Sequence, residues 1–147
     1  IFFQDLEITQ NITELPYPYS ILAGIMAIII YLAYFIFVPL KIYPGQTFAK
    51  KIMNIQVVKE DDSYVDFITL LKREAIGVMI VEGYIAASSS YFHQMINIFI
   101  GKDLNDIYVY VFGIITALSM LWACASPKRK MFHDYIAGTK LSIVVED

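Results

Sequence analysis

Residues 21–40 read ILAGIMAIIIYLAYFIFVPL, and this stretch decides the fold. It lies in a longer run without charge that begins after Glu14 and ends before Lys41. At about 1.5 Å per residue, a helix over 21–40 is about 30 Å long, which matches the hydrocarbon thickness of a bilayer. Such a helix has no polar face toward water. We therefore expect a transmembrane helix over 19–40; the alternative is the buried central helix of a soluble protein.

The composition of the whole chain agrees with a membrane protein. Of its 147 residues, 58% are hydrophobic and 17% are charged, whereas soluble domains carry about 25% charged residues. We expect residues 1–147 to form a single membrane domain. The net charge of −3 gives no reason to expect a nucleic-acid partner. The single cysteine, Cys124, excludes an internal disulfide.

Two further stretches predict spans, at about 75–92 and 107–126. The first contains Glu82, and the polar and apolar residues after it either extend the helix, lie along the membrane surface or re-enter it. Residues 51–59 and 141–145 have the partial alternation and β-branched content of short strands. The predicted fold is an all-α transmembrane helical bundle with three spans and a small cytoplasmic β pair.

The basic residues predict the orientation. Segments 41–74 and 127–147 hold every Lys and Arg of the chain except Lys102. By the positive-inside rule these segments are cytoplasmic, so residues 1–18 are external and the C-terminus is cytoplasmic. The chain starts outside at Ile1 without a signal peptide, which leads us to expect a fourth helix upstream.

Glu82 is the sharpest candidate for function. It follows Glu74 by about 12 Å of helix, which puts it near the middle of the bilayer, where an unpaired carboxylate costs several kcal/mol. We consider two roles: a cation or proton site, and a structural carboxyl bonded to a neighbouring helix. Ser89 and Ser90 share its predicted helix face, where they either pack against another helix or line a polar path.

The sequence holds no clustered metal-ligand spacing, no nucleophile motif and no phosphate-binding or dinucleotide-binding loop. We therefore expect no metal and no cofactor, and we do not expect an enzyme.

Three boxes in order carry a family resemblance. Residues 45–50, GQTFAK, precede Val57 and Val58; Arg73 comes before the next predicted span; and residues 133–139, HDYIAGT, follow the last one. The order resembles the RDD family of bacterial inner-membrane proteins, with its GQTxGK box, its VV strand, its Arg and its HDxxAGT box. Ala49 stands where the family usually has Gly, and the helix with the family's own Arg and first Asp is absent from this chain. The matching motif residues are Gly45, Gln46, Thr47, Lys50, Arg73, His133, Asp134, Gly138 and Thr139.

The resemblance implies a multi-pass protein of the bacterial inner membrane, proposed for transport, with some relatives linked to sodium–proton exchange. We expect a small transporter or cation/proton exchanger; the alternative is a non-transporting accessory or scaffold subunit of a larger membrane complex. The expected partners are the lipid bilayer and either further copies of the chain or other membrane subunits. We also expect Asp134 to pair with Arg73 or Lys50 and to lock the helix ends, although direct ligand binding stays open. The strands around Gln56 and Ser142 should pair beneath them.

Overall fold

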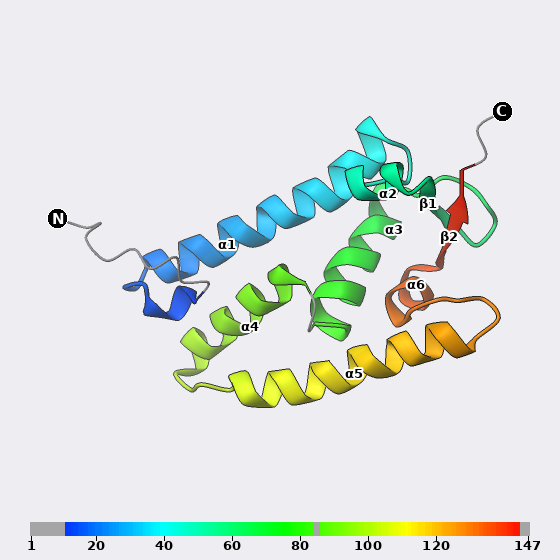
Figure 1. Ribbon diagram of the computed structural model, residues 1–147. Helices are drawn as coiled ribbons and strands as arrows, with labels where there is room; N and C mark the ends of the chain where they lie inside the picture. Colours follow the sequence, from blue (N-terminus) through cyan, green and yellow to red (C-terminus); the bar gives the residue numbers. More distant parts are fainter. Residues whose placement is uncertain (1–10, 84–85, 145–147) are drawn as a thin grey trace.

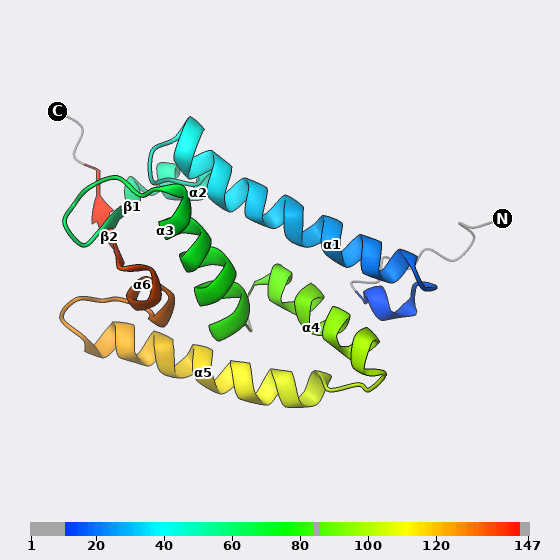
Figure 2. The ribbon, with the colours of Figure 1, turned by 180° about the vertical axis from the view of Figure 1, so that it is seen from behind.

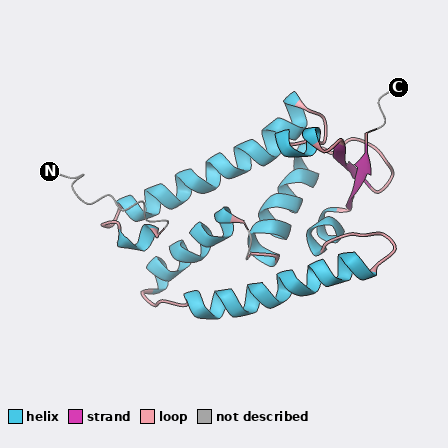
Figure 3. Ribbon diagram, viewed as in Figure 1, coloured by secondary structure: helices cyan, strands magenta, loops and turns pink. Residues whose placement is uncertain are grey.

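A computed structural model describes residues 11–83 and 86–144, which are mostly helical with a small antiparallel sheet at one end (Figures 1 and 3). The helices are η1 (Ile12–Glu14), α1 (Tyr19–Leu32), η2 (Ala33–Ile42), α2 (Phe48–Ile52), α3 (Phe67–Leu71), η3 (Lys72–Val81), α4 (Ala87–Ile100), α5 (Asn105–Ala125) and α6 (Phe132–Ala137). The strands are β1 (Ile55–Lys59) and β2 (Thr139–Ile143). We call the part around β1, β2, α2 and α6 the sheet end, and the opposite part the η1 end.

The helix predicted for the first span is present and continuous. α1 runs directly into η2, so that Tyr19–Ile42 forms 24 residues of helix long and apolar enough to cross a membrane. η2 has the wider π-helical turn, in which Tyr43 N–H donates to the carbonyl of Val38. The helix ends before Gly45, whose positive φ of 70° makes the turn into the next segment.

The helix predicted for the last span is also present. α5, with 21 residues, is the second helix among the described residues that could cross a membrane. α1 and α5 lie on opposite sides of the molecule in both views (Figures 1 and 2). Both turn large apolar side chains outward: Leu22 is 61% exposed and Leu121 is 65% exposed. Surfaces of this kind suit contact with lipid.

The prediction of one helix over 75–92 is wrong. Asp66 caps α3 by accepting from Thr69 N–H at 2.8 Å, and α3 continues through η3 to Val81. The chain then leaves the helix at Glu82, and α4 begins at Ala87 as a separate helix that extends to Ile100. The physical reason is that Glu82 turns its carboxylate toward α5 and α6, where several donors meet it.

Small residues bring the central helices close to their neighbours. A Cβ on Gly24 of α1 would lie 2.7 Å from the sulfur of Met95 on α4. A Cβ on Gly77 of η3 would lie 2.6 Å from the Cβ of His133 on α6 and 2.8 Å from its Cα. The absence of a side chain at these glycines therefore allows α4 to pack closely against α1, and α6 against η3.

The predicted strand pair is confirmed at the sheet end. β1 and β2 are antiparallel, with Gln56 opposite Ser142. The second strand runs over Thr139–Ile143, slightly earlier than the expected 141–145, and residues 145–147 lie outside the described residues. Val57 packs with Ile36, Val65 and Leu70 in a buried apolar cluster, so the sheet is fastened to the ends of η2 and α3.

Candidate functional site

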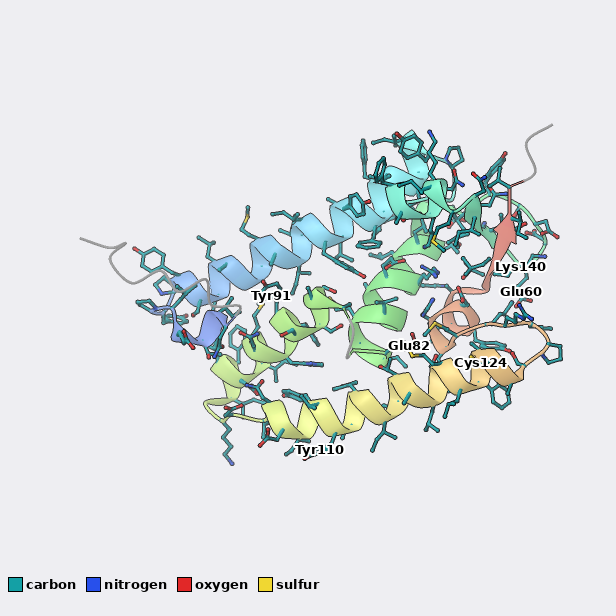
Figure 4. All side chains as sticks on the ribbon, viewed as in Figure 1. Glu60, Glu82, Tyr91, Tyr110, Cys124 and Lys140 are labelled. Atoms are coloured by element: carbon teal, nitrogen blue, oxygen red, sulfur yellow. The ribbon has the colours of Figure 1, made fainter. Side chains whose placement is uncertain are left out.

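Glu82 lies buried where the chain leaves η3, and Figure 4 shows it facing α5 and α6. One carboxylate oxygen accepts from Ser119 Oγ at 2.5 Å and from the backbone N–H of His133 at 3.0 Å. The other oxygen lies 2.7 Å from Nδ1 of His133. The backbone carbonyl of Glu82 accepts from Thr116 Oγ1 at 3.1 Å. Three donors therefore converge on one carboxylate, and all of them come from later parts of the chain.

The tautomer of His133 follows from its contacts. Its Nε2 lies 2.8 Å from Nη2 of Arg73. A guanidinium nitrogen only donates, so Nε2 accepts and the imidazole proton resides on Nδ1. That proton points at Glu82. The His133 ring is therefore neutral in this arrangement, and it connects the carboxylate of Glu82 to the guanidinium of Arg73.

Arg73 is the centre of the second half of the site. Its Nε lies 3.2 Å from a carboxylate oxygen of Asp134, and its Nη1 lies 2.6 Å from one of Glu74. Glu74 also accepts from the Tyr31 hydroxyl at 3.1 Å, and Asp134 accepts from Thr139 Oγ1 at 2.9 Å. The expected pairing of Asp134 with Arg73 is therefore present. We call the connected set the polar network; its members are Tyr31, Arg73, Glu74, Glu82, Ser119, His133, Asp134 and Thr139.

The polar network holds more acidic than basic groups. Glu74, Glu82 and Asp134 are all buried, and Arg73 is the one buried guanidinium that contacts the network among the described residues. Lys50, in the last turn of α2, lies near enough for the charges of the polar network to change its pKa. Burial and the positive charge of Arg73 lower the pKa of Lys50 to about 8, against the opposing effects of Glu74 and Asp134. The buried network therefore holds more carboxylates than cationic groups.

The remaining motif residues shape the sheet end. Gly45 has φ +70°, and a Cβ there would collide with the carbonyl oxygen of Val57. Gln46 donates through Nε2 to the carbonyl of Ile55 at 3.0 Å, and Thr47 is buried at the start of α2. Gly138 ends α6 with φ +66°. These residues hold β1 and α6 in the positions that the polar network needs.

The helix breaks between Glu82 and Ser89, so Ser89 and Ser90 do not share a helix face with Glu82. Ser89 is buried and donates to the carbonyl of Val78 at 3.4 Å. Ser90 accepts from Gln94 Nε2 at 3.0 Å. Ser89 therefore packs α4 onto η3, and Ser90 belongs to a different cavity from Glu82.

A cavity of about 500 Å³ lies beside the polar network. Apolar side chains form most of its wall, and Tyr31, Glu82 and His133 bring polar groups to it. The remaining lining residues are Phe35, Val78, Ala86, Ala87, Thr116, Met120 and Met131. Glu82 and His133 are thus buried from bulk water and still border space in which a neighbouring group can move.

Sequence reasoning missed Tyr31, Glu74 and Ser119 as members of the site. Glu74 carries one weak signal, since it directly follows Arg73 before an apolar run. Ser119 and Thr116 are three residues apart in an apolar helix, which places two hydroxyls on one side of α5. Polar residues at this spacing within a span are the signal that could have indicated them.

Comparison with protein families gives one match. The model of the RDD family matches residues 1–138. The chain belongs to the RDD family. Within this RDD protein the matched region includes every member of the polar network except Thr139. Searches of curated proteins and of solved structures found no match. The RDD assignment and the two membrane-length helices together make this a membrane protein.

Proposed function

We propose that this RDD protein exchanges protons for a monovalent cation across the bacterial inner membrane, with Glu82 as the proton-binding carboxylate. The observation that carries the proposal is the contact of buried Glu82 with Nδ1 of His133 at 2.7 Å, in the wall of a cavity. Carboxylates buried at membrane depth are costly, and they are commonly found on ion and proton pathways. The proposal makes the chain a carrier rather than an enzyme.

The proposed topology has three crossings, of which the middle one is broken. α3 and η3 run from the sheet end to the middle of the molecule, and α4 continues from there to the η1 end (Figures 1 and 2). The sheet end carries nearly all basic residues of the chain, so we assign it to the cytoplasm. Glu82 then lies at the break near the middle of the membrane. Broken helices at this depth form ion sites in many transporters.

The hydrogen bonds supply a mechanism for coupling. In the observed arrangement Ser119, the backbone of His133 and its ring all donate to the Glu82 carboxylate. A protonated carboxyl must donate a hydrogen of its own, so it cannot keep all three contacts. Proton binding therefore loosens α6 from the break. Release of the proton restores the contacts and returns α6, which couples the charge on Glu82 to the position of α6.

Proteoliposomes test the proposal directly. The purified full chain is reconstituted with an internal pH dye, and a Na⁺ or K⁺ gradient is imposed. We expect protons to move against the cation, and Glu82→Gln to slow this exchange at least tenfold. Glu14→Gln, which changes an exposed carboxylate of η1, is the matched control and should exchange at the wild-type rate. Size-exclusion profiles and Tm values show whether each variant is folded. Exchange by Glu82→Gln at the wild-type rate would overturn the role of Glu82.

A second candidate function is a non-transporting subunit of a membrane complex. The observation that favours it is that protein donors already satisfy the Glu82 carboxylate, as a purely structural group requires. In this case α1 and α5 would use their exposed apolar faces to contact other subunits or further copies of the chain. A folded wild-type protein that exchanges neither Na⁺ nor K⁺ for protons, and that co-purifies with a stoichiometric partner in mild detergent, would establish this function instead.

A further inference from the structure

A second cavity, of about 220 Å³, lies on the η1 side of the break. Polar groups from α4 and from the start of α5 line it, and Gly83 forms part of its wall next to Glu82. Its principal polar side chains are Ser90, His93, Gln94, Asn105 and Tyr108. This wall differs from that of the larger cavity, which is mostly apolar. A space of this size with several hydrogen-bonding groups holds water rather than remaining empty.

His93 is the buried group that this water would serve. Its side chain packs against two rings of α5, with centroid distances of 4.4 Å to Tyr108 and 4.5 Å to Phe112. Within residues 11–83 and 86–144, no group makes a hydrogen bond to its imidazole nitrogens. The cavity that His93 lines is where water can provide hydrogen-bond partners for these nitrogens.

The His93 ring also lies against the break itself. A Cβ on Gly83 would be 3.1 Å from Cε1 of His93 and 3.5 Å from its Nε2. Glu82 is the adjacent residue, and it borders the other cavity. Gly83 therefore lets an imidazole approach the backbone beside the buried carboxylate, which any side chain at this position would hinder.

One side of α5 joins the two cavities. Tyr108 and Phe112 pack against His93, while Thr116 and Ser119, further along the same helix, donate to the backbone and the carboxylate of Glu82. Residues at these spacings lie on one helix face. The face runs from the η1 end to the polar network. His93 contacts it nearer the η1 end, and Glu82 contacts it nearer the polar network.

We propose that the cavity at the η1 end is a water-filled vestibule through which protons enter from the external side, and that His93 at its base passes them toward Glu82. The inference rests on the proposed exchange function and names the residue through which the carboxylate is loaded. An imidazole accepts a proton on one ring nitrogen and releases one from the other, so a proton can cross the ring without movement of the backbone. The alternative is that His93 is only a ring packed against Tyr108 and Phe112.

Thiol labelling tests whether the vestibule contains water. In a Cys124→Ser background, single cysteines replace Ser90 at the wall and His93 at the base. Leu118→Cys, on the outward apolar face of α5, is the control. The charged, membrane-impermeant reagent MTSET is added to the external side of intact cells. We expect the cysteines at positions 90 and 93 to react and the cysteine at position 118 not to react. A cysteine at position 93 that stays unmodified while the one at position 90 reacts would overturn the inference.

The proton-transfer role is tested by His93→Gln in proteoliposomes. We expect exchange about tenfold slower than wild type and without the pH-dependent step that titration of an imidazole imposes. Of the other titratable groups, Tyr108 packs against the ring, and Glu82 is the residue next to Gly83. An unchanged pH profile in His93→Gln would show that the ring only packs. Wild-type protein that exchanges no protons would overturn the proposed function and the transfer step, whereas the labelling pattern would still decide whether the vestibule exists.

Discussion

Arg73 and His133 are in direct contact, with 2.8 Å between Nη2 of the guanidinium and Nε2 of the imidazole. The contact fixes which nitrogen of His133 carries the proton and directs that proton at Glu82, 2.7 Å away. Arg73 and His133 together therefore determine how the buried carboxylate of Glu82 is held. The interaction extends over three elements, η3, α6 and the break after Val81.

Two substitutions of His133 separate its two contacts. His133→Asn keeps a donor near the position of Nδ1 and loses the contact with Arg73, whereas His133→Gln keeps an acceptor near Nε2 and loses the donor to Glu82. We expect each to lower the unfolding free energy by about 1–3 kcal/mol, because a buried charged group loses a partner. Thermal unfolding in mild detergent measures this loss. We expect Glu82→Gln to lower the stability of the His133→Asn protein, which keeps the donor to Glu82. The same change should have a smaller effect in the His133→Gln protein, which has already lost that donor. Equal effects in the two proteins would contradict the assigned tautomer.

Removing the charge of Arg73 should be more harmful than removing the whole cluster of charges. Arg73→Met leaves Glu74 and Asp134 buried without their cation, at an expected loss of about 3–5 kcal/mol. The triple variant Arg73→Met, Glu74→Gln, Asp134→Asn removes the uncompensated carboxylates as well, so we expect it to be more stable than the single variant. Chemical unfolding in detergent compares the two proteins. A triple variant that is less stable than Arg73→Met would show that these groups do not act as a charge cluster.

Two glycines offer a matched test of helix packing. In Gly77→Ala the new methyl group meets the Cα and Cβ of His133, which cannot move without displacing α6. In Gly24→Ala it meets the flexible end of Met95, which can take another rotamer. We expect a loss of about 1–3 kcal/mol for Gly77→Ala and a clearly smaller loss for Gly24→Ala. Equal Tm changes in the two variants would contradict the close approach of α6 to η3.

Lys50 predicts a pH dependence of stability. Its pKa is lowered from 10.5 to about 8 by burial and by Arg73, so between these values the unfolded chain holds more protons on Lys50 than the folded chain does. Stability must then rise with pH from about 8 to 10.5, by about 1–3 kcal/mol from this group alone. Lys50→Met removes the contribution. The difference between wild type and Lys50→Met, measured by chemical unfolding at several pH values, should grow over this window and stay constant below it.

The sequence predicts well those parts of the fold that depend on local chemistry. The charge-free run before Lys41 predicts the first span, and the hydrophobic run ended by Pro127 predicts the last. Asp66 in front of an apolar segment indicates the helix cap that the structure contains. The pairing of Asp134 with Arg73 is expected because the family boxes place Arg73 before the second span and Asp134 after the third, on the same predicted side, and the two side chains do meet.

The break at Glu82 could not be predicted in the same way. By hydropathy alone, residues 75–92 form one apolar run. Hydropathy does not reveal the break, because the partners of Glu82 lie much later in the chain, at Ser119 and His133. Whether a carboxylate stays inside a helix or ends it depends on the donors that tertiary structure brings to it. The contact between His133 and Arg73 could not be predicted either, because no local sequence pattern indicates that α6 lies next to η3.

The antiparallel pairing of β1 with β2 has a consequence for biogenesis. Glu82 and Arg73 leave the ribosome well before His133 and Asp134, and β2 is the last described element to appear. Until α6 and β2 have been synthesised, Arg73 lacks its Asp134 partner and Glu82 lacks the donors of His133, so we expect the nascent chain to keep η3 hydrated at the membrane surface. We expect a cysteine replacing Val78, in the Cys124→Ser background, to react with MTSET on the cytoplasmic side when the chain is truncated after residue 126. The same cysteine should be protected when the chain extends to residue 144, and equal labelling of both chains would show that η3 inserts without its later partners.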